Sequence, residues 1–383
     1  MTGRNVRSVT IQDHSLWGRL GERRVPLSFN LEITARCNNS CRHCYINLPA
    51  EDRSAQAREL SPDQISRLAD EAVSLGAMWC LITGGEPFLR DDFPEIYENL
   101  KRKGLLVSIF TNACLINESH IRLFKRCPPR DIEVSVYGVT GETYERITRR
   151  AGSFAAFRRG LDLLEGSGTK VRLKAVAMRS NVAELPAIER FCLERTKDYF
   201  RFDPFLHLRY DGNERRNAEI RAERLQPEEI VRIEQADAAR VEALRKECGG
   251  PIVTEPIQGE SVPLFRCGTG NSGFSVSFDG LFRLCPDLWH PECVYDLKKG
   301  ALADAWNHFA PKVREKRTGR NEYLTTCQIC PVIDLCFWCP AHAHLETGAL
   351  DARIEYFCRV AHARARALKF DDRLKPAGKN PHL

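Results

Sequence analysis

The stretch Cys37-Asn38-Asn39-Ser40-Cys41-Arg42-His43-Cys44-Tyr45 brings three thiols together within eight residues. Polar residues that favour turns separate the cysteines, so one tight loop can present all three sulfurs. A structural zinc site needs four ligands in a closed tetrahedron. This trio must therefore either recruit a distant fourth ligand or leave one coordination position open, and the rest of the sequence has to decide which.

The composition is that of a globular protein with an unusual number of cysteines. The chain has 383 residues, of which 16 are cysteines, and a formal net charge of +6. No apolar run is long enough to cross a bilayer, and the N-terminus lacks the apolar segment of a secretory signal, so we expect a cytoplasmic protein without a membrane partner. Reducing compartments do not keep disulfides, so the cysteines indicate metal binding or catalysis. The 57 basic and 51 acidic residues nearly balance, and we expect no nucleic-acid partner.

Short apolar runs alternate with amphipathic helical patterns through the first half of the chain. The predicted strands cover 26–34, 78–83, 105–111, 132–138, 171–178 and 199–210. The predicted helices lie between them, near 62–75, 92–103, 117–126, 153–165 and 184–197. Strands separated by helices pair in parallel through right-handed crossovers. The pattern therefore predicts an α/β fold, a partial (β/α)6 barrel that is TIM-like but stops short of eight units.

Unusual residues follow the ends of the first four predicted strands. The cysteine loop follows the first strand, and Gly84-Gly85-Glu86-Pro87 follows the second. Thr111-Asn112 closes the third, and Ser135 to Tyr137 ends the fourth. In barrels of this kind the chemistry collects at the C-terminal ends of the strands. All these residues are expected on one rim.

The remainder of the chain differs from the barrel in composition. The stretch from 211 to 247 is highly charged and predicted to be helical, and the part beyond it is rich in Gly, Pro and Cys. Such a small cysteine-rich region is typical of a domain organised around metal. We expect an N-terminal segment, a barrel, a bridging segment and a small α+β domain, with the bounds 1–26, 27–210, 211–247 and 248–383.

Three thiolates on one loop can each hold a different iron of a [4Fe-4S] cluster and leave the fourth iron without a protein ligand. The pattern CxxxCxxC followed by an aromatic residue, formed by Cys37, Cys41, Cys44 and Tyr45, resembles the hallmark of the radical S-adenosylmethionine (SAM) superfamily. The resemblance covers about 27–210. It implies that the amino and carboxylate groups of SAM bind the open iron. It also implies that an electron from the cluster cleaves SAM to a 5'-deoxyadenosyl radical, which abstracts a hydrogen atom from the substrate.

Gly84-Gly85-Glu86-Pro87 resembles the GGEP motif of this family, which meets the methionyl amino group of SAM. Two glycines allow close approach of the backbone to a ligand, and a carboxylate suits an ammonium group. Alone, the motif could be an ordinary turn after a strand, but its place one β unit after the cysteine loop favours SAM binding. The resemblance adds four residues around SAM, which are Tyr45, Asn112, Ser135 and Lys174. Lys174 could equally be a solvated side chain at a strand edge.

Seven cysteines and a glycine in the C-terminal part follow the spacing C-x12-G-x4-C, a gap, C-x2-C-x5-C-x2-C, a gap, and C. This resembles the SPASM domain, which carries two auxiliary iron-sulfur clusters in a subgroup of the family. The resemblance implies that one auxiliary cluster is held by Cys327, Cys330, Cys336 and Cys358. It implies that the other is held by Cys267, Cys285 and Cys339, and that this cluster either has an open iron or is completed by Cys293.

Zinc is the alternative metal for the paired cysteines. Ribbon-type zinc sites usually separate their CxxC pairs by about fifteen or more residues, whereas five residues separate Cys330 from Cys336. Asp287 lies two residues after Cys285, and the resemblance makes it a candidate acid or base in substrate oxidation.

Other polar and thiol side chains have ordinary interpretations. His342 and His344 are two residues apart, so on a helix they face different sides and cannot reach one ion together. Along the sixth run, Asp203, His207 and Arg209 alternate, which suits a polar cavity lining or salt bridges on one sheet face. Cysteines without ligand spacing are expected to pack as small hydrophobes: Cys80, Cys114, Cys127, Cys192 and Cys248.

The resemblance favours a radical SAM/SPASM oxidoreductase or maturase that oxidises or cross-links a peptide or protein. The expected cofactors are SAM, one SAM-binding [4Fe-4S] cluster and two auxiliary clusters. The expected partners are the substrate, an electron donor such as a flavodoxin or ferredoxin, and a separate leader-binding protein, because only about 26 residues precede the barrel. The alternatives are a small-molecule or cofactor-biosynthesis dehydrogenase and, from a different class, a non-catalytic iron-sulfur or zinc-binding protein.

Overall fold

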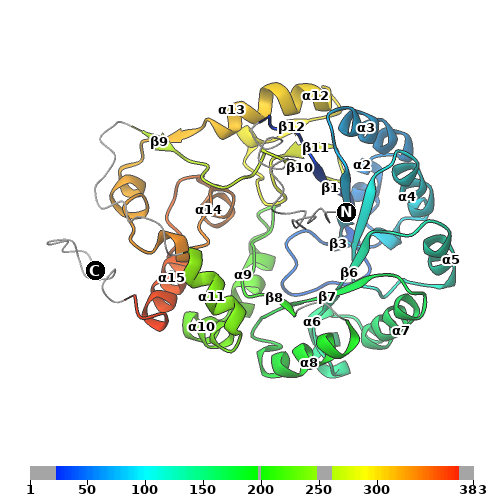
Figure 1. Cartoon of the computed structure of the whole chain (residues 1–383), viewed down its shortest axis with the longest axis horizontal. Coiled ribbons are helices and arrows are strands. Elements are labelled where there is room, and N and C mark those ends of the chain that lie inside the picture. The colour runs from blue at the N-terminus through cyan, green and yellow to red at the C-terminus, as the bar shows by residue number, and fades with distance from the viewer. Residues whose placement is uncertain (1–22, 197–199, 248–260, 371–383) are drawn as a thin grey trace, which may run out of the picture.

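The computed structural model describes residues 23–196, 200–247 and 261–370. Its centre is one sheet of nine strands in the order β12-β11-β10-β1-β4-β5-β6-β7-β8 (Figure 1). Each of the six predicted strands is present in part or whole, and neighbours in this set pair in parallel. The prediction of an α/β partial barrel is therefore confirmed. The strands are β1 Ser28–Thr34, β4 Trp79–Gly84, β5 Leu106–Thr111, β6 Asp131–Val136, β7 Val171–Val176 and β8 Arg201–Asp203.

An arc of helices covers the outside of these strands (Figure 1). The five predicted helices are α3 Pro62–Ser74, α4 Phe93–Arg102, α5 Glu118–Arg126, α7 Ser153–Gly166 and α8 Leu185–Arg195. Two further helices, α2 Arg53–Arg58 and α6 Gly141–Thr148, were not predicted because each is too short to show a helical period. Both begin at a capping side chain, Asp52 and Thr140, which satisfies an unpaired N–H group of the first turn. The short elements nearby are β2 Arg36–Cys37, β3 Leu48–Pro49, η2 Pro87–Leu89 and η3 Val182–Glu184.

The barrel core lies between the sheet and these helices. Alternate residues of β6, Ile132, Val134 and Val136, are fully buried and belong to the same apolar cluster as Phe157 and Leu161 of α7. Because side chains alternate along a strand, the residues between them face the barrel interior. The charged or polar positions of β6 therefore lie inside the barrel.

The sixth strand is much shorter than predicted. Only β8 Arg201–Asp203 pairs with β7, and Pro204, which has no N–H group to donate, follows directly. Asp203 lies 3.9 Å from Lys174 Nζ. The prediction that Asp203, His207 and Arg209 lie on one face of the sheet is therefore wrong. After Asp203 the chain leaves the sheet, so that His207 contacts Asp287 and Arg209 pairs with Asp211.

The C-terminal part extends the barrel sheet. The strand β10 Gly273–Val276 pairs in parallel with β1, and β11 Leu281–Arg283 and β12 Tyr295–Asp296 follow in antiparallel order. The sheet thus contains strands from both sides of the boundary expected at 248. The other elements of this part are β9 Val262–Pro263, η4 Pro291–Cys293, α12 Leu302–Asp304, η5 Ala305–Phe309, α13 Ala310–Arg314, β13 Arg317–Thr318, η6 Tyr323–Cys327, η7 Ile333–Leu335, α14 Pro340–Thr347 and α15 Glu355–Ala367.

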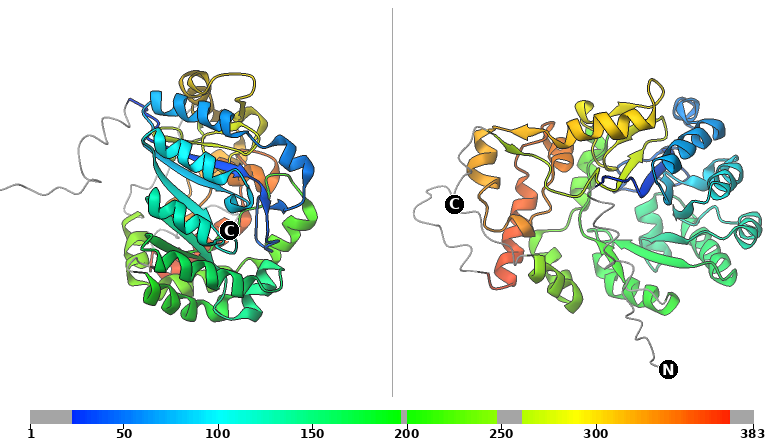
Figure 2. Two further views of the ribbon diagram at one scale, coloured as in Figure 1. Left: turned by 90° about the vertical axis from the view of Figure 1, so that its right-hand side faces the viewer. Right: turned by 45° about the horizontal axis from the view of Figure 1, so that its top comes forward.

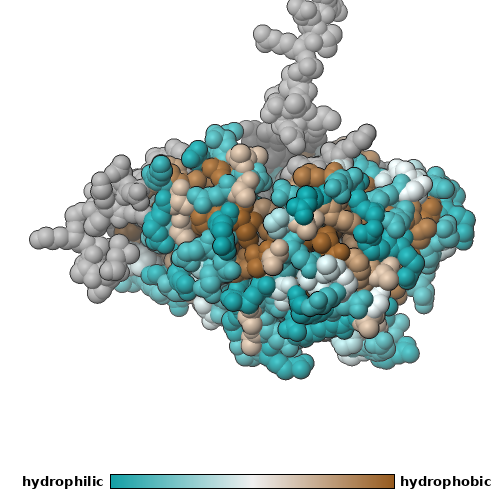
Figure 3. Space-filling model, turned by 90° about the horizontal axis from the view of Figure 1, so that it is seen from below, coloured by the Kyte–Doolittle hydropathy of each residue, from teal (hydrophilic) through white to brown (hydrophobic). Residues whose placement is uncertain are grey.

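The charged bridging segment forms three short helices, α9 Glu214–Glu223, α10 Pro227–Gln235 and α11 Ala238–Glu247. The helices α10, α11, α14 and α15 lie on the opposite side of the strands from α4 and α5 (Figures 1 and 2). Helix α10 packs on α15. Within the part of the chain that the structure describes, no helix combines the length and apolar character needed to span a membrane. Hydrophilic residues cover most of the face seen in Figure 3 and interrupt its apolar patches.

Candidate functional site

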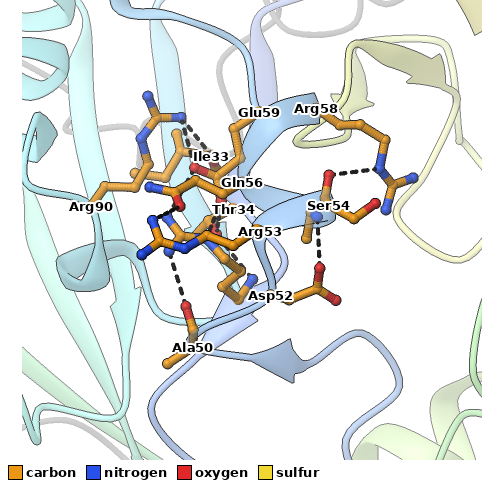
Figure 4. Close-up of polar contacts among 12 residues, drawn as sticks. Ile33, Thr34, Ala50, Asp52, Arg53, Ser54, Gln56, Arg58, Glu59 and Arg90 are labelled. Carbon is orange, nitrogen blue, oxygen red and sulfur yellow. Dashed lines mark hydrogen bonds and ion pairs between the residues drawn. The ribbon is translucent and has the colours of Figure 1, made fainter.

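Buried ion pairs hold the point where β1 passes into the cysteine loop (Figure 4). Arg36 donates to Glu59 Oε1 at 2.8 Å and to the carbonyl oxygen of Ala50 at 3.0 Å. Arg90 donates to the carbonyl oxygen of Ile33 at 2.9 Å. The three charged side chains are all more than nine-tenths buried, and buried charges are tolerated only when they are paired and hydrogen-bonded. The network therefore fixes the backbone that enters the loop.

Helix α6 holds the loop from the other side. The backbone N–H groups of Ser40 and Arg42 donate to the carbonyl oxygens of Thr148 and Ile147 at 2.9 and 3.0 Å. Carbonyl groups in the last turn of a helix have no partner within that helix, so they are available to a neighbouring loop. The unpredicted helix thus contributes directly to the conformation of the cysteine loop.

N–H groups point at the sulfurs of this loop. Asn39 N lies 3.4 Å from Cys37 Sγ, and Asn47 N lies 3.4 Å from Cys44 Sγ. Asn112 Nδ2, at the end of the third strand, lies 3.7 Å from Cys37 Sγ. Hydrogen bonds to sulfur are one of the ways in which a protein tunes the thiolates that ligate iron.

The three thiols lie close enough to influence one another. Burial, followed by neighbouring thiols, raises the pKa of Cys37 and of Cys41. Cys37 and Cys41 therefore become thiolates only when a cation compensates their charge. The structure therefore places Cys37, Cys41 and Cys44 at the C-terminal end of β1 in an arrangement whose donors suit a metal cluster.

The two glycines of the GGEP stretch approach the protein backbone. A Cβ atom on Gly84, where φ is +143°, would lie 2.1 Å from the carbonyl oxygen of Thr34, and one on Gly85 would lie 2.2 Å from that of Arg36. Gly85 N donates to Thr34 O at 2.7 Å, and Glu86 N donates to Arg36 O at 2.9 Å. The two glycines therefore let this turn pack closely against the backbone that leads into the cysteine loop. The sequence predicted only a close approach to a ligand.

Glu86 differs from the expectation in a similar way. Its fully buried carboxylate accepts from the hydroxyl of Thr111 and from Asn112 N, both at 2.8 Å, and from Phe88 N at 3.2 Å. Burial raises the pKa of Glu86 to about 7, although these hydrogen bonds oppose the rise. The carboxylate thus ties the end of β4 to the end of β5 and is engaged by protein donors. Asn112 continues the connection, because its Nδ2 donates to Asn38 Oδ1 in the loop at 2.8 Å.

The other predicted SAM contacts lie on the same side of the barrel. The carbonyl oxygen of Tyr45 accepts from Tyr210 N at 3.4 Å, and its ring centroid lies 6.3 Å from that of His207. Ser135 is adjacent to Lys174 in the register of β6 and β7. Lys174 pairs with Asp203 at 3.9 Å, and its expected place beside SAM remains a prediction.

Four C-terminal thiols that are predicted to hold one auxiliary cluster lie near enough to influence one another, and their ligation of a cluster stays a prediction. Burial raises the pKa of each, and Cys358 of α15 is close enough to act on the other three. The four sulfurs come from η6, the turn after it, the end of η7 and α15, and four is the number that a fully ligated [4Fe-4S] cluster requires. They are Cys327, Cys330, Cys336 and Cys358.

The second predicted set is only partly gathered. Burial raises the pKa of Cys285 to about 12, with further contributions from Asp287 and the thiol of Cys339. Cys267 is exposed, whereas Cys293 is fully buried in the apolar core. The thiols of Cys285 and Cys339 thus lie near one another, and the ligation of a cluster by Cys267, Cys285, Cys339 and Cys293 stays a prediction.

Three side chains that the sequence did not connect meet beside this second set. His207 Nδ1 lies 3.1 Å from Asp287 Oδ1, and His342 Nε2 lies 3.8 Å from Asp287 Oδ2. Burial opposes ionisation of Asp287, but the two histidines outweigh it and hold its pKa well below the usual range. Such a carboxylate is a weak proton acceptor, so its acid-base role remains a prediction. The three segments are far apart in sequence, and no spacing pattern could have identified the group.

The cysteines without ligand spacing behave in two ways. Cys80 and Cys192 are buried in the core, as expected. Cys114 lies beside the cysteine loop, with its sulfur 3.8 Å from Asn39 Nδ2. Cys248 lies outside the described residues.

Comparisons with known proteins agree with the fold and with the cysteine loop. The model of the Radical SAM superfamily matches residues 31–192. The PqqA peptide cyclase of Gluconobacter oxydans (strain 621H) is 31% identical over 292 residues, which cover 74% of this chain and 76% of that protein. The Fe-coproporphyrin III synthase of Methanosarcina barkeri (strain Fusaro / DSM 804) is 27% identical over 331 residues, 79% and 80% of the two chains.

A solved structure extends the agreement to the C-terminal part. Streptococcus suis SuiB bound to its precursor peptide SuiA has a TM-score of 0.64 at 14% identity, and the match covers 94% of this chain and 84% of SuiB. At this identity the likeness concerns the fold alone. Together with the two sets of cysteines and the sequence relatives, these matches show that the chain belongs to the radical SAM superfamily, in the group that carries a SPASM domain.

Proposed function

We propose that this protein reductively cleaves SAM and uses the resulting radical to modify a peptide or protein by oxidation or cross-link formation. The observation that carries the proposal is the cysteine loop, in which three thiols meet at the C-terminal end of β1 among N–H donors. Cys37, Cys41 and Cys44 would hold the [4Fe-4S] cluster. When bound and reduced, the cluster supplies the electron that cleaves SAM to a 5'-deoxyadenosyl radical, which takes a hydrogen atom from the substrate.

The surrounding residues have supporting roles in this proposal. Asn112 and Asn47 donate to the loop, and Glu86 fixes the ends of β4 and β5 beside it. The backbone of Gly84–Pro87 and the side chains of Ser135 and Lys174 would border SAM, and Tyr45 would pack near its adenine.

The two C-terminal cysteine sets would hold auxiliary clusters that anchor the substrate or carry away an electron. Cys327, Cys330, Cys336 and Cys358 would bind one cluster, and Cys267, Cys285 and Cys339 the other. The grouping of the first four thiols supports full ligation of that cluster. An electron donor such as a flavodoxin or ferredoxin is required, because cleavage of SAM consumes an electron.

A peptide substrate is favoured by the relatives. The protein from Gluconobacter oxydans is named for cyclising the PqqA peptide, and the SuiB structure contains its precursor peptide. The second candidate is a small-molecule or cofactor-biosynthesis reaction, and the similarity to the Fe-coproporphyrin III synthase supports it. Mass spectrometry of products formed from candidate peptides and from a porphyrin would decide between them.

Replacement of Cys41 by Ala tests the radical SAM proposal. After anaerobic reconstitution, the wild-type protein should bind about twelve iron atoms, four for each of three clusters, and should form 5'-deoxyadenosine from SAM under reductant. Cys41→Ala should lose about four of these iron atoms and all SAM cleavage. Cys127→Ala, a cysteine outside the ligand sets, is the matched control and should behave as wild type. Intact SAM and a zinc-filled protein without visible absorption would instead indicate a non-catalytic metal protein.

A further inference from the structure

His207, Asp287 and His342 form a cluster outside the iron-sulfur ligand sets. His207 lies in the segment after β8, Asp287 in the loop after β11, and His342 in the first turn of α14. Their ligating nitrogen and oxygen atoms all lie within 4.8 Å of one another. The side chains are 22%, 22% and 14% exposed, so the cluster is largely removed from solvent. Three separate parts of the chain thus supply three polar groups to one enclosed point.

The hydrogen bonding of His342 fixes which ring nitrogen faces the cluster. Its Nδ1 lies 3.3 Å from the carbonyl oxygen of Phe337. A carbonyl only accepts, so Nδ1 carries a hydrogen, and Nε2 presents a lone pair whenever the ring is neutral. That Nε2 is buried and has no hydrogen-bond partner among the described residues. At 3.8 Å from Asp287 Oδ2 it is too far for a hydrogen bond.

A lone pair that faces a carboxylate across this gap is unfavourable unless His342 is protonated or a metal cation lies between the two groups. The distances leave room for one. Ligands about 2.1 Å from a tetrahedral zinc ion lie about 3.4 Å apart. The separations from Asp287 to His207 and to His342, 3.1 and 3.8 Å, lie on either side of that value.

The chemistry of the three groups is that of a site for a divalent transition metal. Two imidazoles and one carboxylate bind Zn²⁺ or Fe²⁺ and leave a coordination position for water or a substrate. Metal-binding histidines commonly donate their second N–H group to a backbone carbonyl, as His342 does to Phe337. Thiolates, which iron-sulfur clusters require, are absent from this set.

We propose that His207, Asp287 and His342 bind one divalent transition-metal ion, separately from the iron-sulfur clusters. The site lies between the two functional regions. His207 is next to Tyr45 of the cysteine loop, and His342 N donates to Cys339 Sγ at 3.4 Å. In this site Asp287 is a ligand and not a free acid or base.

Zinc is the probe for this site, because it can be distinguished from cluster iron. The protein is reconstituted anaerobically with iron and sulfide, incubated with ZnCl2 and freed of excess metal. We expect one zinc atom per chain in addition to full cluster iron, with nitrogen and oxygen scatterers at about 2.0–2.1 Å in its X-ray absorption spectrum. His207→Gln and His342→Gln should each lose this zinc and retain cluster iron. His344→Gln, on the same helix and hydrogen-bonded to Gly348, should retain both.

Three outcomes would overturn the proposal. In the first, the wild-type protein binds no more zinc than His207→Gln does. In the second, the bound zinc is coordinated by sulfur at about 2.3 Å. In the third, both histidine variants retain the zinc. A protonated His342 paired with Asp287 would produce the first outcome. The readout does not depend on SAM cleavage, so a failure of the proposed radical chemistry and a failure of this site are distinguishable.

Discussion

Asn112 connects the third strand to the cysteine loop through its side-chain amide, which contacts both Cys37 Sγ and Asn38 Oδ1. Hydrogen bonds to cluster thiolates favour the reduced state because it carries more negative charge. We expect Asn112→Ala to make the reduction potential of the SAM-binding cluster more negative and to slow SAM cleavage. A redox titration followed by electron paramagnetic resonance measures the shift. Asn99→Ala on α4 is the control, and equal potentials in the two variants would contradict the role of Asn112.

Glu86 should make the free energy of unfolding depend on pH. Its pKa rises from 4.5 to about 7 on folding because the carboxyl is buried. The folded protein binds the proton more tightly than the unfolded chain, so this stabilisation is complete below the unfolded pKa and is lost as pH rises through about 7. At 1.36 kcal/mol per pKa unit, the total loss in the free energy of unfolding is roughly 3 kcal/mol. We expect wild type to lose about 2–3 kcal/mol more than Glu86→Gln between pH 5 and 8. Anaerobic guanidinium unfolding measures the difference, and Glu118→Gln, at an exposed position of α5, should follow wild type.

At the scale of elements, the turn after β4 packs directly on the entry to the cysteine loop. A Cβ atom at Gly85 would lie 2.2 Å from Arg36 O and 2.6 Å from Ala35 O. Since both neighbours are backbone atoms, they can yield only if the strand moves. Gly85→Ala should therefore lower the free energy of unfolding by about 2 kcal/mol or more and reduce the iron bound by the loop.

Gly166 provides the matched control for this substitution. A Cβ atom there meets nothing within 4 Å, and Ala loses less backbone entropy on folding. Gly166→Ala should thus be neutral or stabilising by up to about 1 kcal/mol. Denaturation midpoints and iron content measure both variants, and equal effects would show that the contact at Gly85 is unimportant.

The elements show what the sequence can and cannot predict. The parallel strands and five helices follow from periodicity and capping residues, and the cysteine loop follows from its spacing. Helix α6 was missed because eight residues give too little pattern, yet it holds the loop. The sixth strand was overestimated because the apolar run continues past Pro204 while its backbone pairing stops. The group formed by His207, Asp287 and His342 depends on tertiary packing that no local pattern encodes.

At the scale of the whole molecule, side-chain ion pairs join the C-terminal part to the rest. Arg283 of β11, fully buried, donates to Glu32 of β1 at 2.8 Å. Arg364 of α15 donates to Glu234 of α10 at 2.8 Å, and both side chains are at most 2% exposed. Since α15 also carries Cys358, the second pair helps to position a thiol that is predicted to bind an auxiliary cluster. The position of that sulfur thus depends on a residue outside the cysteine-rich region.

Glu234→Gln tests this dependence. The substitution keeps the shape of the side chain but leaves Arg364 buried without its counter-charge, which typically costs about 3–5 kcal/mol. We expect a loss of this order in the free energy of unfolding and a lower iron content, while cleavage of SAM at the cysteine loop is retained. Glu228→Gln, at an exposed position of the same helix, should change stability by no more than about 0.5 kcal/mol. If both variants kept full iron and equal stability, the auxiliary cluster would be held by the cysteine-rich region alone, and the contact between α10 and α15 would only be a packing surface.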